Sequence, residues 1–279
     1  MNSAPPMSPK PVSKRILITG CSSGIGRAIA VEATARGHVV IATARDLAKI
    51  ADLRADQRIA LDVTDDTSVA QAVAAAGPVD VLVNNAGISI WGAVEAADSA
   101  DVQRIFETNL FGALRMARAC LPAMRARGSG AIFQISSAAG RRSTAVLGHY
   151  AASKAALDAY SDAMRLELKP FGIHVCSVLL GAVESAFSQN RTVLAHDAYR
   201  AIVDGAIARV ARSRTTPHSA ESVARRVLDA IEMPAPPLRL DGTGDAFDLI
   251  RQRTEQDDES WEAASLATLL GPDWDSGSA

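Results

Sequence analysis

Residues 16–26 read ILITGCSSGIG, an apolar run followed at once by a glycine-rich turn and the start of a helical pattern. The turn glycines are Gly20, Gly24 and Gly26, spaced G-x-x-x-G-x-G, whereas the general dinucleotide fingerprint is G-x-G-x-x-G. Glycines let a turn approach a pyrophosphate closely, and the free N–H groups of a helix N-terminus favour its negative charge. The stretch therefore predicts a strand, a phosphate-binding turn and a helix, although a ligand-free tight turn gives the same pattern.

Short apolar runs alternate with segments of helical period along the rest of the chain, which is typical of βαβ units and a parallel sheet. We expect strands at residues 15–19, 38–44, 58–61, 79–84, 130–136, 174–180 and 238–240. We expect helices at residues 25–35, 67–76, 101–127, 150–168 and 222–231. The predicted fold class is α/β: a single-domain doubly wound (Rossmann) fold with a seven-stranded parallel sheet and helices on both faces.

The ends of the chain differ from its body. Residues 1–13 carry four prolines and lack the apolar segment of a signal peptide, so we expect a disordered arm there. Residues 254–279 contain seven acidic residues and no Lys or Arg, which predicts that residues 251–279 form an acidic C-terminal tail with a possible short helix. Residues 14–250 are left as the folded domain. Its slight positive charge does not fit a nucleic-acid partner, which requires a strongly basic face.

The cysteines and the hydropathy bear on the compartment. Cys21, Cys120 and Cys176 are odd in number and widely spaced, matching neither a disulfide framework nor a metal site, so we expect reduced thiols in a cytoplasmic protein. No apolar run approaches the ~18 residues of a membrane-spanning helix, and we expect no membrane span.

The end of the second predicted strand bears on the choice of cofactor. A protein that binds NAD usually has an acidic residue there for the ribose 2′-hydroxyl, whereas this chain has Arg45, which suits a 2′-phosphate. Asp46 is the rival, but it precedes residues 47–50 and suits an N-cap. We therefore favour NADP (NADPH) over NAD. The alternative is that Arg45 is an ordinary solvated charge.

Three further groups of candidate site residues come later in the chain, two at the ends of strands and one on a helix. Asp62 and Val63 come after the third strand, where they suit an adenine contact, although an aspartate capping Thr64 is equally ordinary. The fourth strand is followed by the run Asn84-Asn85-Ala86-Gly87, which alone would indicate a turn. Tyr150 and Lys154 are spaced by four on one helix face, so the lysine charge is expected to lower the tyrosine pKa from its usual ~10. A surface pair of this spacing is also common.

The ordered set of motifs resembles the short-chain dehydrogenase/reductase family over residues 14 to about 240. The resemblance implies a catalytic tetrad of Asn109, Ser137, Tyr150 and Lys154. It makes Tyr150 the acid or base, Ser137 the group that stabilises the substrate oxygen, Lys154 the group that lowers the tyrosine pKa and holds the ribose, and Asn109 a proton-relay anchor. Ser136 is the neighbouring candidate for Ser137, and strand alternation places the two on opposite faces. The implied cofactor contacts come from Gly20, Ser22, Ser23, Gly24, Ile25, Gly26, Arg45, Asp62, Val63, Asn85, Ala86, Gly87, Tyr150, Lys154, Val183 and Ser185.

The residues around these motifs look most like the hydroxysteroid and retinol dehydrogenase branch, which implies a lipophilic ketone, aldehyde or secondary alcohol. The family often has Pro-Gly after the sixth strand, where this chain has Leu180-Gly181, so the turn near the nicotinamide is expected to differ. Residues 185–218 are expected to form a lid over the small-molecule substrate, and the resemblance implies a homodimer or homotetramer. Two alternatives stay open, an enoyl reductase and a catalytically silent NADP(H)-binding sensor or scaffold.

Overall fold

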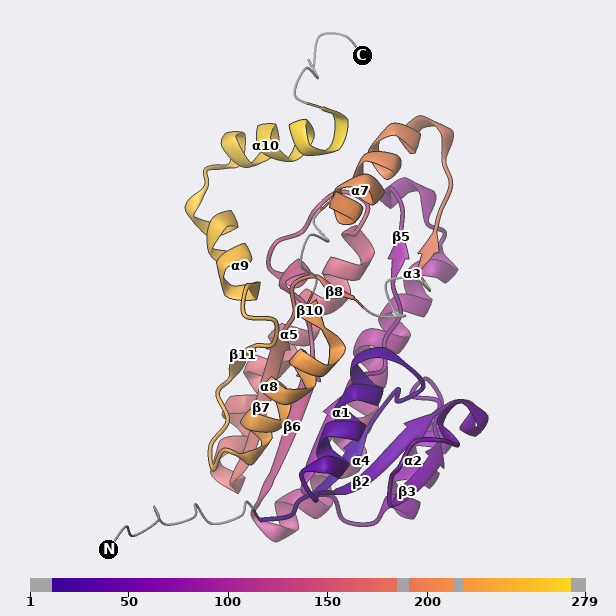
Figure 1. Cartoon of the computed structure of the whole chain (residues 1–279), viewed down its shortest axis with the longest axis vertical. Helices are drawn as coiled ribbons and strands as arrows, with labels where there is room; N and C mark the ends of the chain where they lie inside the picture. The colour runs from indigo at the N-terminus through magenta and orange to yellow at the C-terminus, as the bar shows by residue number, and fades with distance from the viewer. Residues whose placement is uncertain (1–11, 185–190, 213–217, 272–279) are drawn as a thin grey trace, which may run out of the picture.

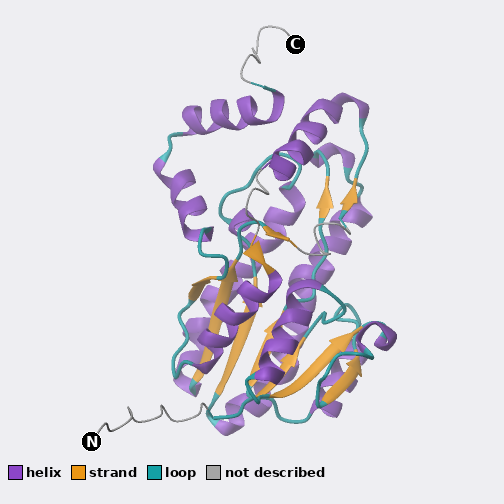
Figure 2. Cartoon of the chain, in the orientation of Figure 1, coloured by secondary structure: helices purple, strands orange, loops and turns teal. Residues whose placement is uncertain are grey.

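The computed structural model describes residues 12–184, 191–212 and 218–271. Its centre is a sheet of order β11-β7-β6-β4-β1-β2-β3 in which every neighbouring pair is parallel (Figures 1 and 2). All seven predicted strands are present within two residues of their expected bounds, so the predicted doubly wound α/β fold is confirmed. They are β1 (Arg15–Ile18), β2 (Val39–Ala44), β3 (Gln57–Ala60), β4 (Val81–Asn84), β6 (Gly130–Ile135), β7 (Ile173–Leu179) and β11 (Arg239–Asp241).

Helices cover both faces of the sheet, as expected from central strands whose side chains are mostly apolar on both sides. In β1, Ile16 and Ile18 belong to the core on one face and Leu17 to the core on the other. The first layer contains α1 (Gly24–Ala35) and α8 (Ala220–Glu232). The second layer contains α2 (Asp66–Ala76), α4 (Gly112–Arg127) and α5 (Gly148–Leu168). Neither face of the sheet is left to water.

The helical stretch predicted at residues 101–127 is present, but it is not a single α-helix. The segment begins with α3 (Ser99–Phe106), passes through a π-helical turn (Glu107–Phe111) and continues as α4. A π turn widens the helix by one residue and occurs often at functional sites. Here it contains Asn109, whose side chain is 1% exposed and hydrogen-bonds both backbone groups of Ile88. These bonds tie the π turn to the loop after β4.

Smaller elements lie beyond the carboxyl ends of the strands, at the top of Figure 1. Two short parallel pairs form there, β5 (Ile90–Trp91) with β9 (Thr192–Val193) and β8 (Val183–Glu184) with β10 (His218–Ser219). Three helices complete this end: α7 (Arg200–Arg212), α9 (Ala246–Glu255) and α10 (Asp258–Leu270). The segment predicted as a lid thus contains α7, although 185–190 and 213–217 lie outside the described residues.

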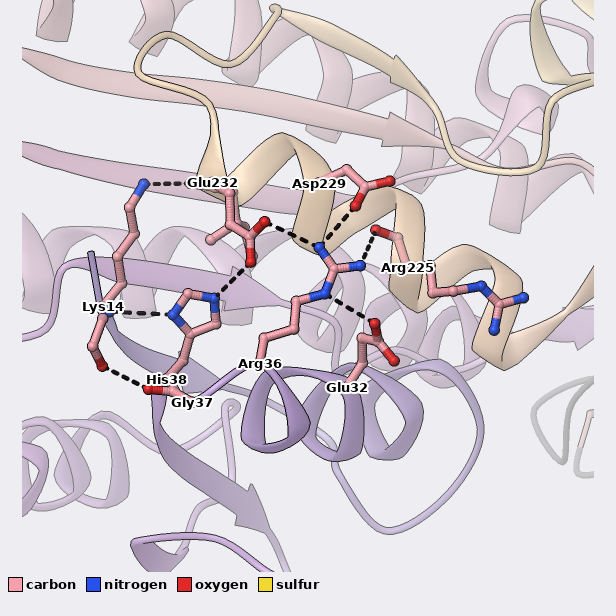
Figure 3. A network of polar contacts seen from close by, with 10 residues as sticks. Lys14, Glu32, Arg36, Gly37, His38, Arg225, Asp229 and Glu232 are labelled. Carbon is pink, nitrogen blue, oxygen red and sulfur yellow. Dashed lines mark hydrogen bonds and ion pairs between the residues drawn. The ribbon is translucent and has the colours of Figure 1, made fainter. Parts of the chain in front are cut away.

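At the opposite edge of the sheet, a polar network joins the ends of α1 and α8 (Figure 3). The guanidinium of Arg36 donates to the carboxylates of Glu32 (2.9 Å), Asp229 (2.7 Å) and Glu232 (3.1 Å). Glu232 also contacts His38 Nε2 at 3.2 Å, and the Lys14 backbone N–H donates to His38 Nδ1 at the same distance. Each of these charged groups is paired, so the network fastens the two helices without leaving a buried charge alone.

Two further findings concern membranes and thiols. Across the three described ranges, no helix is both long enough and apolar enough to cross a membrane. Cys21, Cys120 and Cys176 are free and buried, and burial raises the pKa of each thiol to about 12. Buried thiols of this kind are unreactive.

Candidate active site

The sheet order reverses between β1 and β4, which is where doubly wound sheets bind their ligands. The loops after these two strands are bonded to each other. Thr19 Oγ1 accepts hydrogen bonds from the backbone N–H groups of Asn85 and Ala86, both at 2.9 Å. In return, Asn85 Nδ2 donates to the carbonyls of Thr19 (2.9 Å) and Gly20 (3.0 Å). The glycine turn and the Asn-Ala-Gly run therefore form one rigid unit.

The glycine turn has a conformation that other residues would strain. Gly20 and Gly24 have φ of +73° and +57°, and a Cβ on Gly26 would lie 2.3 Å from Asn85 Nδ2 and 2.5 Å from the Gly20 carbonyl oxygen. Ser23 is the N-cap of α1, and its side chain does not bond the described first turn of the helix. The N–H groups of that turn, beside the exposed Ser22, are therefore suited to an anion.

Arg45, at the end of β2, lies near Asp62, at the end of β3. Asp46 Oδ1 accepts from the Ala48 N–H at 3.0 Å, so it serves as the N-cap expected from the sequence. Asp62 Oδ1 accepts from the Thr64 N–H (2.9 Å) and hydroxyl (2.7 Å), which is the capping alternative for that residue. Burial raises the pKa of Asp62, but the Thr64 hydrogen bonds and the charge of Arg45 outweigh burial and lower it. Arg45 itself is exposed beside this carboxylate.

Asn109 connects the loop after β4 to α5. Its Oδ1 accepts from the Ile88 N–H (2.8 Å), and its Nδ2 donates to the Ile88 carbonyl (3.0 Å) and to Ser153 Oγ (3.1 Å). Ser153 Oγ in turn donates to the Tyr150 carbonyl at 2.7 Å. Gly87 is close as well, because a Cβ there would lie 3.2 Å from Asn109 Oδ1. Asn109 thus positions the first turn of the helix that carries Tyr150.

Tyr150 and Ser137 face each other across the end of β6. The pKa of Tyr150 is raised to about 12. Burial is the main cause, and it outweighs the opposing effect of the Ser137 hydroxyl. Ser137 Oγ also lies 3.4 Å from the Leu180 carbonyl and accepts from the Ala139 N–H at 3.1 Å. Sequence analysis left Ser136 as a neighbour of Ser137; in the structure Ser136 is 1% exposed and acts to lower the pKa of Asp158, whereas Ser137 acts on the pKa of Tyr150. Ser137 is therefore the serine that can share an oxygen ligand with Tyr150.

Lys154 is 5% exposed on the same face of α5 as Tyr150. Its Nζ donates to the Ile135 carbonyl at 2.7 Å and lies 5.8 Å from the centre of the Tyr150 ring. Burial lowers the pKa of Lys154 to about 8, against the opposing charge of Asp158. The expected lowering of the Tyr150 pKa by Lys154 is not found. Burial dominates, and the ammonium is bonded to a carbonyl rather than to the phenol.

Asp158 is a site residue that the motifs did not indicate. It lies one helical turn beyond Lys154, its side chain is 2% exposed, and the Nε of Arg141 approaches its carboxylate at 3.4 Å. Burial raises the pKa of Asp158, while the hydroxyls of Ser136 and Ser177 and the charge of Arg141 lower it. The spacing Tyr150, Lys154, Asp158 repeats every four residues. This spacing places Asp158 on the same helix face as Tyr150 and Lys154, and it could have identified Asp158 from the sequence.

The remaining expected contacts are at the edge of the site. Val183 lies in β8, paired with His218 of β10, while Ser185 lies outside the described residues. At the departure from Pro-Gly, the Gly181 N–H donates to Thr243 Oγ1 at 2.9 Å. His149, which adjoins Tyr150, has its Nε2 3.4 Å from the Val94 carbonyl oxygen.

The fold and this cluster are those of a dinucleotide-dependent oxidoreductase. The family model for short chain dehydrogenases matches residues 14–193, and the chain belongs to this family. It is 41% identical over 182 residues to 3-ketodihydrosphingosine reductase of Bacteroides thetaiotaomicron, covering 64% of this chain and 67% of that protein. It is 40% identical over 187 residues to retinol dehydrogenase 8 of Homo sapiens, covering 62% of this chain and 60% of that protein. The chain thus matches about two thirds or less of these relatives' lengths.

Solved structures agree with the family. A short-chain dehydrogenase from Streptomyces avermitilis superposes with a TM-score of 0.80 at 38% identity, covering 91% of this chain and 96% of that one. A short-chain dehydrogenase from Burkholderia cenocepacia in complex with NADP gives a TM-score of 0.74 at 26% identity, covering 91% and 98%. Other structures of this fold hold NAD. The protein is therefore an oxidoreductase of a family whose members bind NAD or NADP.

The Asp158→Asn variant tests whether the buried carboxylate controls Lys154. Removing its negative charge should lower the pKa of Lys154 further below about 8, because that charge opposes the effect of burial. A lysine with a lower pKa loses its proton at lower pH. The alkaline limb of the pH profile of kcat should therefore move to lower pH, by about 1 unit.

The matched control is Asp162→Asn, since Asp162 is on the same helix but is 44% exposed and paired with Arg239. Its profile should coincide with that of the unmodified chain. An Asp158→Asn profile with an unshifted alkaline limb would show that Asp158 has no influence on the titrating group.

Proposed function

We propose that the protein transfers a hydride between the nicotinamide of NADP(H) and the carbonyl carbon of a ketone or aldehyde, or the corresponding carbon of a secondary alcohol. The observation that carries the proposal is the position of the Ser137 hydroxyl beside Tyr150, where it acts to lower the pKa of the phenol, with Lys154 buried one turn away on α5. The bound nicotinamide supplies or accepts the hydride. The residues of the chain bind, orient and move the proton.

Each residue of the tetrad has a separate role in this proposal. Tyr150 gives its hydroxyl proton to the substrate oxygen during reduction and takes it back during oxidation. Ser137 donates a hydrogen bond to the same oxygen as negative charge develops there. Lys154 holds the ribose and supplies positive charge beneath the tyrosine. Asn109 keeps α5 in place through Ser153 and anchors the proton relay.

A lipophilic substrate fits two observations. The names of both curated relatives indicate lipid substrates, a ketosphingoid base and a retinoid. In this chain, Trp91 and Val146 near the site are buried apolar side chains. Val146 also belongs to a buried apolar cluster with Val203 of α7, so this side chain contributes to packing as well.

Turnover should depend on Tyr150 and Ser137. With NADPH and a series of ketones of increasing apolar chain length, kcat/KM should rise with chain length, by up to about tenfold for each two methylene groups. Tyr150→Phe and Ser137→Ala should each lower kcat by about 100-fold or more, because each removes a group that acts on the substrate oxygen.

Ser161→Ala is the control for that experiment. Ser161 is also a buried serine, but its hydroxyl is used by the Leu157 carbonyl within α5. Wild-type kcat in Tyr150→Phe would refute the proposed mechanism, and the absence of turnover in every chain would favour a silent NADP(H)-binding sensor. Equal kcat/KM for short and long ketones would refute the lipophilic substrate.

The two residues that follow β2, Arg45 and Asp46, are the basis for proposing NADP rather than NAD. Arg45 is exposed and its charge acts on the nearby Asp62, whereas the carboxylate of Asp46 accepts a hydrogen bond from the Ala48 N–H. An arginine can bind a 2′-phosphate through charge-assisted hydrogen bonds, and a carboxylate already engaged in capping is a poor acceptor for a 2′-hydroxyl.

Arg45→Ala should therefore weaken NADPH binding by about 10- to 100-fold and leave NADH binding unchanged, as measured by fluorescence titration. Arg54→Ala is the control, because Arg54 is another exposed arginine outside the predicted cofactor site. Equal binding of NADPH and NADH by the unmodified chain would transfer the assignment to NAD.

We further propose that the protein forms a homodimer or homotetramer through the helices that carry Asn109 and Tyr150. Large apolar side chains are exposed there, with Leu166 at 75% and Tyr160 at 48% on α5. Sedimentation should give two or four times the chain mass of 29.2 kDa. Leu166→Glu should lower that mass, whereas Val31→Glu on α1, a residue 53% exposed, should not. A monomeric unmodified chain would contradict the proposal.

A further inference from the structure

A second concave site lies at the carboxyl end of the sheet, apart from the glycine turn. It is a cavity of about 350 Å³ between the loop at residues 142–144 and helices α7, α9 and α10. Two arginines line it, Arg142 from the loop and Arg209 from α7. The lining is otherwise rich in hydroxyl and amide groups, from Ser143, Ser265, Gln252 and Gln256.

The positive charge of this cavity is not balanced by the described residues. Arg209 donates one hydrogen bond, from Nη2 to Thr144 Oγ1 at 3.1 Å, while its buried Nε has no partner within the described ranges. Burial lowers the pKa of Arg209, and the charge of Arg142 lowers it further. Glu255 lines the cavity, but no ion pair joins it to either arginine among the described contacts. The formal charge of the lining is therefore positive.

The unpartnered donor of Arg209 and the repulsion between the two arginines reduce the stability of the folded chain, and a bound anion would remove both effects. An N–H donor removed from water without an acceptor costs about 1–3 kcal/mol, and more when the group is charged. Two guanidinium groups that face one space also repel each other. An oxyanion between them satisfies the donor and screens the repulsion, and guanidinium groups favour carboxylate and phosphate oxygens over neutral acceptors.

The cavity is also connected to the candidate active site through the chain. The loop that supplies Arg142 continues to Val146 and then to α5, whose third residue is Tyr150. Val146 belongs to one buried apolar cluster with Val203 and Ala206 of α7 and Leu269 of α10. Occupancy of the cavity would therefore stabilise the docking of α7 and α10 on the loop that precedes Tyr150.

We propose that this cavity binds an oxyanion, a carboxylate or a phosphate group, held between Arg142 and Arg209. The site is separate from the 2′-phosphate position proposed at Arg45, which follows β2. The anion is either the acidic end of the substrate or a free anion, and the two sources share the same recognition chemistry.

The probe for the test is inorganic phosphate, measured by titration calorimetry at constant ionic strength. The parent is the full chain carrying Arg45→Ala, so that phosphate binding at the proposed 2′-phosphate position is removed. Phosphate should bind in the cavity and also at the first turn of α1, which is suited to an anion, so the cavity site is the part of the binding that the cavity variants remove. Adding Arg209→Met or Arg142→Met should weaken this binding by tenfold or more. Adding Arg200→Met should leave it unchanged, because Arg200 is an exposed arginine of α7 paired with Asp197 outside the cavity.

Two outcomes would overturn the proposal: no saturable binding by the parent, or equal affinity in the parent and both cavity variants. The two cavity variants, with melting temperatures compared to the Arg200→Met control, separate loss of binding from loss of folding. The readout is binding, so it does not depend on the proposed hydride transfer.

A kinetic comparison then distinguishes the sources of the anion. A neutral ketone and its ω-carboxylate analogue are compared as substrates in the unmodified chain and in Arg209→Met. If only the KM of the carboxylate rises in the variant, the bound anion is the acidic end of the substrate. If phosphate binding is lost while neither KM changes, the ligand is a free anion.

Discussion

The hydrogen bonds between Thr19 and the backbone of Asn85 and Ala86 are the interaction on which the rest of the site depends. They join the ends of β1 and β4, the two strands between which the sheet order reverses. The Asn85 amide completes the connection by bonding the Thr19 and Gly20 carbonyls. Gly26 has no side chain because that amide occupies the space a Cβ would need. The helix N-terminus suited to a pyrophosphate is thus oriented by the adjacent strand as well as by its own turn.

From this connection a continuous series of hydrogen bonds reaches Tyr150. The run after β4 leads to Ile88, whose two backbone groups are bonded by Asn109. Asn109 bonds Ser153, and Ser153 bonds the Tyr150 carbonyl. Every member is buried or partly buried, so each bond is worth more than it would be in water, and each missing partner would cost more. The cofactor turn and the tyrosine hydroxyl are therefore parts of one rigid arrangement.

Sequence analysis predicted the features that depend on local pattern. Apolar periodicity located all seven strands of the sheet, and the glycine spacing located the turn. The π turn at Asn109 was missed, because its cause is a pair of bonds to Ile88, 21 residues earlier. The docking of α10 was missed for a similar reason: α7 accepts the α10 backbone at Gly205, where a Cβ would collide with the Leu269 carbonyl. A lone glycine in a helical pattern does not identify its partner. The direction of the Tyr150 pKa shift was also wrong, because motif spacing contains no information on burial.

Charged side chains are fully paired at one edge of the sheet and partly unpaired at the other. At the edge where β1 and β2 begin, Arg36 is surrounded by three carboxylates, and Glu232 also contacts His38. At the carboxyl edge, Lys154 and Asp158 are buried on one helix, each with its pKa moved toward the neutral form by burial, and Arg209 keeps an unpartnered Nε. Removing a charged group from water reduces stability even when it is partly paired, so the concentration of buried charge at the carboxyl edge favours a role in binding and proton transfer over a role in folding.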